Sequence, residues 1–450
     1  MIRSLRHLIV VAAVFAAAVL AQPVQIQSAH ATNIERVTSP GGIEAWLVRD
    51  TSLPLIALNF SFLGGANEDP EGKAGTGYMV SSMLDEGAGP LDSRGFHQQL
   101  EENAVELRFS VTHDYFQGSI KLLRERQDQS FELLRLALNE AKFEDAATAR
   151  VASQILAALR RETTDPGSIA GRTWWNTAFA GHPYARPNNG TLTSVPTITG
   201  QDQKDYARRV FTRAHLKVAA VGDIDAAGLG KVLDRVFGAL PASGELRSVP
   251  NAAPREVGRR IVSQLNVPQA VIRLGGVGIP RKDPDFMAAY LVNHILGGGS
   301  FTSRLYDEVR EKRGLAYGVY SYLLNLRHTS MFMASTQTSA DQTREALELI
   351  ELEIRRMVDE GPTDAELAKA KAYLKGAYAL NFDTSTKIAS MLLQIQLDDL
   401  GIDYINRRSA IIDAVTIEDA RRAAKRLASG GVLTTVVGQP KNLASREPGG

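Results

Sequence analysis

The sequence repeats itself at long range, and this repeat limits the folds that the chain can adopt. Asp69-Pro70 has a counterpart in Asp283-Pro284, and each pair lies between an apolar predicted strand and an apolar predicted helix. Two further pairs of segments match, one at a helix start and one at a strand end: 143–149 with 362–368, and 220–223 with 436–439. All three pairs are offset by roughly 214–220 residues, which indicates a duplicated domain rather than a solenoid of short repeats.

The duplication predicts an α+β protein built from two homologous α/β sandwich domains. Each domain is expected to have a mostly antiparallel sheet with helices packed on one side. Residues 239–258 contain several Pro, Ser, Gly and Asn residues and few large apolar ones, which is typical of a linker. We therefore expect an N-terminal domain over residues 32–238 and a C-terminal domain over residues 259–450.

The first 31 residues are predicted to be an export signal rather than part of the fold. Arg3 and Arg6 form a basic start, and residues 8–21 are an apolar run of about 14 residues, which is short for a membrane span. Ala29-His-Ala31 supplies a small-x-small cleavage site, although a cut after Ala21 also fits. No later segment is apolar enough to span a membrane. The mature chain is therefore expected to be exported, to the periplasm if the source is a Gram-negative bacterium.

Composition and motifs exclude several classes of function. A formal net charge of +1, with both signs interspersed, offers no basic surface for nucleic acid. The absence of cysteine excludes disulfides, thiolate zinc sites and cysteine nucleophiles. Neither a Gly-x-Ser-x-Gly elbow nor a phosphate-binding P-loop occurs. Among the histidines, His97 with Glu101 is the one helical pair that suggests a metal, and a surface contact explains it as well.

The most distinctive stretch is a glycine-rich turn followed by a short charged helix and a strand, over residues 296–320. Gly297–Gly299 are expected to give a backbone free to adopt positive φ. Ser300 or Thr302 is expected to cap the helix that follows. Gly314 stands where a left-handed residue would end that helix.

Two side chains at the junction of this helix and strand are candidates for binding. Arg310 lies in the last helical turn and Tyr317 at the start of the strand, so both can face one point. A guanidinium and a phenol both donate hydrogen bonds to carbonyl oxygens. A structural interpretation also exists, in which the arginine complements the helix dipole and the tyrosine packs on the sheet.

The duplicated halves, the glycine-rich turn and the run from Ser303 to Tyr317 together resemble the insulinase/pitrilysin family of zinc peptidases. The branch most similar in these motifs is that of the mitochondrial processing peptidases and their bacterial relatives. The resemblance covers nearly all of the mature chain and implies a clam-shell arrangement of the two domains. In that family an acidic turn leads into a zinc helix of the pattern His-x-x-Glu-His, and this chain has such a turn at residues 68–75.

The zinc helix itself departs from the family pattern. The positions that should read His-x-x-Glu-His read Tyr78-Met-Val-Ser81-Ser82. Zinc requires imidazole, thiolate or carboxylate donors, and Ser81 cannot act as the general base. The family's spacing from Ser82 to its third ligand, a glutamate, leads to Ala158, while Glu162, one helical turn on, lacks partners for a metal site. We therefore expect no metal in this chain.

The resemblance implies a subunit that holds a substrate and leaves the cutting to another chain. In two-chain relatives, one subunit carries zinc and the other contributes an arginine and a tyrosine that grip the substrate backbone, and these correspond to Arg310 and Tyr317. The expected partner is a zinc-bearing homologous subunit in a heterodimer, and the expected substrate is a peptide or unfolded polypeptide. Two alternatives stay open: a non-enzymatic scaffold or binding protein with the same fold, and a self-sufficient enzyme with an unrecognised site.

Overall fold

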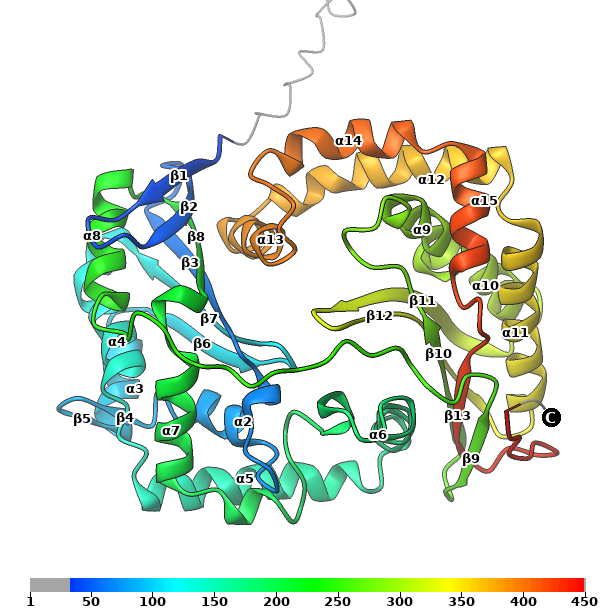
Figure 1. The fold of residues 1–450 in the computed structure, drawn as a ribbon, viewed down its shortest axis with the longest axis horizontal. Coiled ribbons are helices and arrows are strands. Elements are labelled where there is room, and N and C mark those ends of the chain that lie inside the picture. Colours follow the sequence, from blue (N-terminus) through cyan, green and yellow to red (C-terminus); the bar gives the residue numbers. More distant parts are fainter. Residues whose placement is uncertain (1–32, 449–450) are drawn as a thin grey trace, which may run out of the picture. The chain divides into compact units, whose positions relative to one another are not determined.

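A computed structural model describes residues 33–448, and the predicted export signal at residues 1–31 lies outside this range. Two large sheets dominate the fold (Figure 1). The strands of the first are β1 (Glu35–Thr38), β2 (Glu44–Arg49), β3 (Leu55–Leu63), β6 (Glu106–Val111), β7 (Tyr115–Leu123) and β8 (Leu216–Gly222). Those of the second are β9 (Arg260–Gln264), β10 (Gln269–Val277), β11 (Ala316–Leu326), β12 (Thr329–Ser339) and β13 (Leu433–Gly438). A two-stranded sheet of β4 (Gly87–Ala88) and β5 (Leu91–Asp92) lies apart from both.

The two large sheets share one topology. If β1 is set aside, the strand order is β2-β8-β3-β7-β6 in the first sheet and β9-β13-β10-β12-β11 in the second. One pair in each sheet is parallel, β2 with β8 and β9 with β13, and the other pairs are antiparallel. The edge strands β6 and β11 therefore occupy equivalent places, as expected for a duplicated domain.

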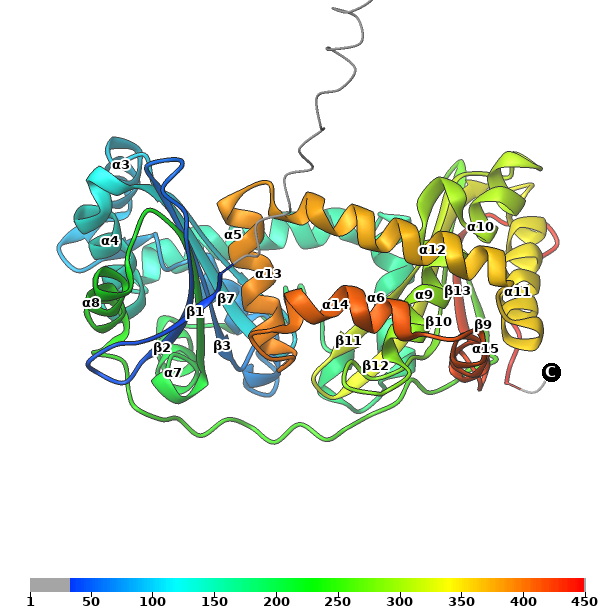
Figure 2. The ribbon, with the colours of Figure 1, turned by 90° about the horizontal axis from the view of Figure 1, so that it is seen from above.

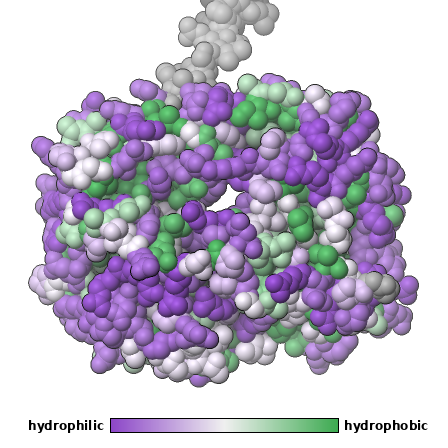
Figure 3. Space-filling view, viewed as in Figure 1, coloured by the Kyte–Doolittle hydropathy of each residue, from purple (hydrophilic) through white to green (hydrophobic). Residues whose placement is uncertain are grey.

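Helices fill the segments between these strands. In the first half they are α2 (Thr76–Ser81), α3 (Ser93–Glu102), α4 (Gln127–Asn139), α5 (Asp145–Glu162), α6 (Pro166–Ala178), α7 (Gly200–Val210) and α8 (Ala226–Phe237). In the second they are α9 (Phe286–Asn293), α10 (Arg304–Tyr306), α11 (Thr343–Glu360), α12 (Asp364–Gly376), α13 (Ser385–Leu397), α14 (Tyr404–Ala414) and α15 (Ile417–Arg426). Among the described residues, none of these helices is both long and apolar enough to cross a membrane. The face shown in Figure 3 is largely hydrophilic, with hydrophobic side chains scattered over it.

Each sheet buries one face against helices of its own half. Strand β3 alternates, so that Ile56, Leu58 and Phe60 enter a core with residues of α4 and α8. In the second sheet, Ile272 and Leu274 of β10 pack into a core with residues of α9, α11 and α15. This is the one-sided packing that the sequence predicts for each domain.

The opposite face of each sheet is covered by a helix from the other half. The sequence predicts helices on one side of each sheet only, so this second layer is an addition. Helix α6 packs on β10 and β13 of the second sheet, and α13 packs on β3 and β8 of the first (Figures 1 and 2). The two helices lie at matching places in the repeat, since Pro166 and Ser385 are separated by 219 residues (385 − 166). The duplicated halves therefore exchange equivalent elements.

Helix α6 is fixed on the second sheet by a buried tryptophan and by backbone contacts. Trp174 is fully buried with Met331, Met333 and Leu433, and its indole N–H donates to the carbonyl oxygen of Leu433 at 3.1 Å. Gly275 of β10 lies directly beneath this ring. A β-carbon at Gly275 would overlap Trp174 Cζ2 and lie 2.5 Å from Met333 Sδ.

Helix α13 is fixed on the first sheet in a similar way. Leu392 and Leu393 join Trp46 and Val221 in a separate buried cluster. The amide of Gln396 donates to the carbonyl oxygen of Val218 at 2.9 Å, within this apolar interface. A buried backbone acceptor is thereby satisfied, which removes a desolvation cost.

Within the second half, an ion pair joins the start of α10 to the start of α12. Arg304, at the beginning of α10, forms two hydrogen bonds of 2.6 Å with the carboxylate of Glu366. Glu366 also completes the capping box that begins α12 at Thr363. Burial alone would raise the pKa of Glu366, but the hydrogen bonds from Arg304 and Thr363 outweigh it and lower this pKa to about 2.

Gly275→Ala should destabilise the protein by about 1–3 kcal/mol, because the added methyl group would force Trp174 and Met333 out of their places. Urea unfolding would measure this loss. Gly318→Ala in the edge strand β11 of the same sheet is the control, since a β-carbon there meets nothing within 4 Å. Equal stability of both variants would show that α6 is not tightly packed on this sheet.

Glu366→Gln should lower the free energy of unfolding by about 1–2 kcal/mol at neutral pH, a figure reduced for the partial exposure of the pair. The folded pKa of about 2 lies below the ordinary value of 4.5, so the carboxylate stabilises the fold above pH 4.5 and this contribution is lost as the pH falls through 2. The difference between wild type and variant, measured by denaturant unfolding at several pH values, should therefore shrink towards pH 2.

Glu348→Gln is the matched control for this experiment. Its carboxylate pairs with Arg344 at 2.8 Å on the exposed side of α11, and fully exposed pairs of this kind add little to stability. A pH-independent difference for Glu366→Gln would contradict the assignment of its charge.

Candidate functional site

The glycine-rich segment is shaped by close approach rather than by positive φ. None of Gly297–Gly299 has a positive φ, and the left-handed residue of the turn is Ser300, with φ of 47°. A β-carbon at Gly297 would lie 2.5 Å from Ser321 Oγ, and one at Gly299 would lie 2.7 Å from the carbonyl oxygen of His294. The expectation of positive φ at the glycines is therefore wrong, because the neighbouring strand and helix leave no room for side chains there.

The helix that follows begins later than the sequence suggests. Ser300–Thr302 form a separate 3₁₀ turn, so Ser303, rather than Ser300 or Thr302, precedes the first helical residue. The hydroxyl of Ser303 donates to the carbonyl oxygen of Ser300 and caps no backbone N–H of the helix. At the other end, Gly314 has φ of 62°, which confirms the predicted left-handed position.

Arg310 and Tyr317 lie side by side, as the sequence predicts. The guanidinium carbon of Arg310 lies 5.2 Å from the centre of the Tyr317 ring and 4.8 Å from that of Tyr306. Such cation–π contacts hold the guanidinium plane without consuming its hydrogen-bond donors. The one hydrogen bond that Arg310 donates to a side chain among the described residues goes to Glu311, at 3.3 Å.

The tyrosine is presented outward by a bulge in strand β11. Ala316 pairs with Thr338, but Val319 pairs with Thr336, so β11 contains one extra residue at this point. Positions three apart in a regular strand face opposite sides. Here Ala316 and Val319 are both buried, while Tyr317 and Tyr320 are 90% and 52% exposed.

Tyr306 and Tyr320 were not predicted as parts of this site. Tyr306 is only 6% exposed, and its ring is a second cation–π partner of Arg310. Its position four residues before Arg310 on a helix is the signal that could have indicated the contact. Nothing local in the sequence marks the bulge that exposes Tyr320 together with Tyr317.

The degenerate zinc positions supply no metal ligands. Tyr78 is partly exposed on α2, whereas the hydroxyls of Ser81 and Ser82 both donate to its carbonyl oxygen, at 2.7 and 3.1 Å. Ala158 lies on α5 and has no donor atom. Within residues 33–448, no cluster of three His, Asp or Glu side chains could hold a metal ion. His97 approaches Asp85 at 3.7 Å rather than Glu101.

The acidic turn before α2 keeps a structural role. Asp69 accepts hydrogen bonds from the backbone N–H groups of Gly75 and Gly77, at 2.7 and 2.8 Å, and so fixes the start of this helix. Burial raises the pKa of Asp69 to about 7. Its two oxygens are directed to the backbone and are not available as ligands.

A cavity of about 360 Å³ opens beside Tyr78. It is bounded by the end of α5, by α6 and by the loop at residues 184–189. Glu162 lines this cavity. Its carboxylate has two hydrogen-bond partners, neither of which could help to bind a metal. Arg172 Nη2 donates to one carboxylate oxygen at 2.9 Å, and Asn189 Nδ2 donates to the other at 2.8 Å.

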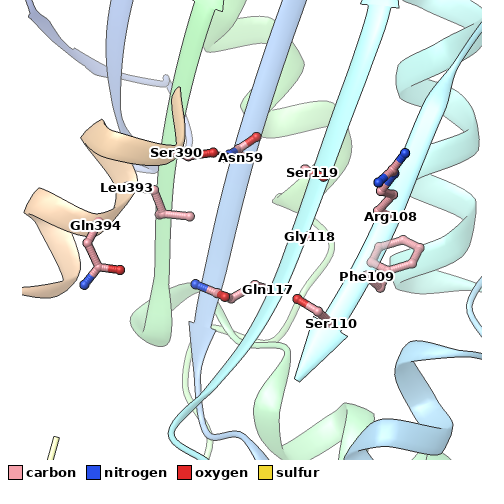
Figure 4. A pocket seen from close by; sticks show the side chains of 10 residues that line it. All are labelled: Asn59, Arg108, Phe109, Ser110, Gln117, Gly118, Ser119, Ser390, Leu393 and Gln394. Atoms are coloured by element: carbon pink, nitrogen blue, oxygen red, sulfur yellow. Dashed lines mark hydrogen bonds between the residues drawn. The ribbon is translucent and has the colours of Figure 1, made fainter. Parts of the chain in front are cut away.

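A second cavity, of about 430 Å³, lies between the first sheet and α13 (Figure 4). Polar side chains line it from three adjacent strands, with Asn59 on β3, Gln117 on β7 and Arg108 on the edge strand β6. The Asn59 amide is hydrogen-bonded to the Ser390 hydroxyl at 2.8 Å. The cavity therefore borders the open edge of the sheet with groups suited to a polar, hydrogen-bonding ligand.

Comparison with known proteins places this geometry in a family. Residues 197–374 match the family model described as the peptidase M16 inactive domain. The chain is 28% identical to the non-peptidase homolog YmxG of Helicobacter pylori, over 74% of this chain and 77% of that protein. It is 25% identical to an uncharacterized zinc protease of Streptomyces coelicolor, over 91% of this chain and 90% of that one.

Solved structures show the same similarity. The crystal structure of a peptidase M16 inactive domain from Pseudomonas fluorescens matches with a TM-score of 0.85 and 26% identity, over 92% of this chain and 99% of that one. A protease from Helicobacter pylori has the same fold, with a TM-score of 0.81 and 19% identity, over 90% and 99% of the two chains. The predicted fold class and the insulinase-like resemblance are confirmed. Residues 197–374 match the M16 inactive domain, and most of the chain is similar to M16-type homologues and to a solved M16 inactive domain.

Proposed function

We propose that this protein is the zinc-less subunit of a heterodimeric M16 peptidase in the periplasm. It would hold an extended peptide or unfolded polypeptide through Arg310 and Tyr317. A homologous partner would supply zinc, through His-x-x-Glu-His and a distal glutamate, and would carry out the water attack. The predicted export signal at residues 1–31 is the basis for the compartment.

One observation carries this proposal: Arg310 and Tyr317 form an ordered donor pair while the metal positions of the same chain are empty of ligands. The guanidinium contacts two aromatic rings and keeps most of its donors free. The Tyr317 ring is almost fully exposed. Both groups can donate to the carbonyl oxygens of a peptide, and a donor at a developing oxyanion typically contributes about 2.7–4 kcal/mol.

The open edge of the first sheet supports a role in holding peptides. Strand β6 pairs with β7 on one side and with no strand of residues 33–448 on the other. An extended peptide can add to such an edge through backbone hydrogen bonds. The polar cavity beside β6 offers Arg108, Ser110 and Gln117 to side chains of that peptide.

The test is reconstitution with an exported homologue that contains His-x-x-Glu-His, such as one encoded by a neighbouring gene. The chain alone should not hydrolyse peptides and should contain no stoichiometric metal, and activity should appear on mixing. Arg310→Gln and Tyr317→Phe should each lower kcat of the mixture by about 10²–10³. Tyr317→Phe keeps the ring over Arg310, so it isolates the hydroxyl donor.

Tyr373→Phe is the control, because Tyr373 of α12 is also exposed but its ring stacks on His294 rather than on Arg310. Full activity in both site variants would contradict the proposal and favour a non-enzymatic scaffold. Chelator-sensitive hydrolysis by the chain alone would contradict it as well, in favour of a self-sufficient enzyme.

A further inference from the structure

The lining of the cavity beside Tyr78 includes a cation, Arg186, that forms no ion pair within the described part of the chain. Among its lining residues, Glu162, Arg172 and Arg186 carry charge at neutral pH. His113 also lines the cavity, but burial, together with the nearby Arg186 and His182, lowers its pKa to about 4, so its ring is neutral. Glu162 and Arg172 form an ion pair at 2.9 Å and cancel. The lining therefore keeps one net positive charge, on Arg186.

Arg186 forms no direct ion pair within the described part of the chain, although the buried carboxyl groups of Glu68 and Asp69 are close enough to interact with it electrostatically. Its Nη1 and Nη2 donate to the backbone oxygens of Asp69 and Asn67 at long distances, 3.3 and 3.4 Å. Its Nε is buried and has no acceptor among residues 33–448. The nearby Asp69 carboxylate is held by two backbone N–H groups on α2. A guanidinium with one buried donor unpaired and two donors in long hydrogen bonds is poorly satisfied, which favours an anionic acceptor here.

The rest of the cavity suits an organic anion with an apolar body. Trp175 of α6 forms part of the lining and is stacked on Phe179 at 5.2 Å, which fixes its ring. Tyr78 and Pro187 are further lining residues. A volume of about 360 Å³ lies in the range of small-molecule sites. An aromatic or aliphatic side chain can therefore lie against Trp175 while its carboxylate reaches Arg186.

We infer that this cavity binds the C-terminal carboxylate of a peptide, with Arg186 as its counter-ion and Trp175 against the terminal side chain. Arginine pairs with carboxylates through two parallel hydrogen bonds, which gives geometric as well as electrostatic selectivity. The identification of the carboxylate as that of a peptide rests on the proposed function, whereas the anion site itself does not.

The experiment uses the whole chain without a partner enzyme and follows tryptophan fluorescence and calorimetric heat. The probe is acetyl-Ala-Ala-Phe, as the free acid and as the C-terminal amide. The free acid should bind saturably and change the fluorescence, and the amide should bind at least tenfold more weakly. Equal binding of acid and amide, or no binding of either, would overturn the inference without any variant.

Variants and competing anions complete the test. Arg186→Gln should weaken binding of the free acid at least tenfold, and Arg208→Gln, which removes a mostly exposed arginine of α7, should leave it unchanged. Acetate and inorganic phosphate should compete poorly. Phosphate binding as tight as that of the peptide acid would overturn the assignment to a peptide terminus.

Failure of the carboxylate site can be distinguished from failure of the proposed function. Loss of activity in the Arg310 and Tyr317 variants with normal binding of the free acid by the isolated chain would support both. Binding of the free acid by a chain that never activates a partner would leave the carboxylate site intact and remove only the peptidase role.

Discussion

Two helices, α6 and α13, each complete the sheet of the opposite half, and the rest of the structure depends on this exchange. A sheet that buries only one face leaves apolar groups such as Trp46, Met333 and Leu433 without cover. The exchanged helices cover them with Leu392 and Leu393 on one side and Trp174 on the other. Hydrogen bonds from Trp174 and Gln396 satisfy strand carbonyls inside these interfaces. Apolar burial of this kind is the largest favourable contribution to folding.

Helix α6 also connects this packing to the candidate sites. Trp174 points into the second sheet, while Arg172 and Trp175 line the cavity beside Tyr78. The same helix therefore fixes the sheet that carries β11 and positions two groups of a binding cavity. The charged side chains of these regions have different kinds of partner. Glu366 and Glu162 are paired with arginines, whereas Arg310 rests on aromatic rings and keeps its donors free.

Much of the fold follows from local patterns and from the repeat. The period-two alternation of β3 and the helical signal over residues 145–162 depend on side-chain spacing, which the sequence displays directly. The pairing of Arg310 with Tyr317 follows because Gly314 brings a helix end close to a strand start. The absence of metal ligands at four positions follows from the residue types alone, because these side chains lack the donor groups that zinc requires. The positions are Tyr78, Ser81, Ser82 and Ala158.

Features that depend on tertiary contact could not be predicted in this way. The exchange of α6 and α13 joins segments more than 250 residues apart, such as Trp174 and Leu433, and helical periodicity does not tell which sheet a helix covers. The bulge at Tyr317 depends on how β11 pairs with β12. The lack of an ion pair at Arg186 becomes visible only in the fold, where Glu162 is paired with Arg172 instead and Asp69 binds backbone N–H groups.

The glycines at 297–299 have a further consequence. Glycine runs are usually taken as flexible, but here each missing side chain makes room for a neighbour, with Ser321 against Gly297 and Asn293 against Gly298. The segment is thus wedged between the end of α9 and strand β11. It cannot swing as an independent flap, and any displacement would have to carry α9 and the tyrosines of β11 with it. The glycines therefore allow close packing here, and the edge that carries Arg310 and Tyr317 moves as one block or not at all.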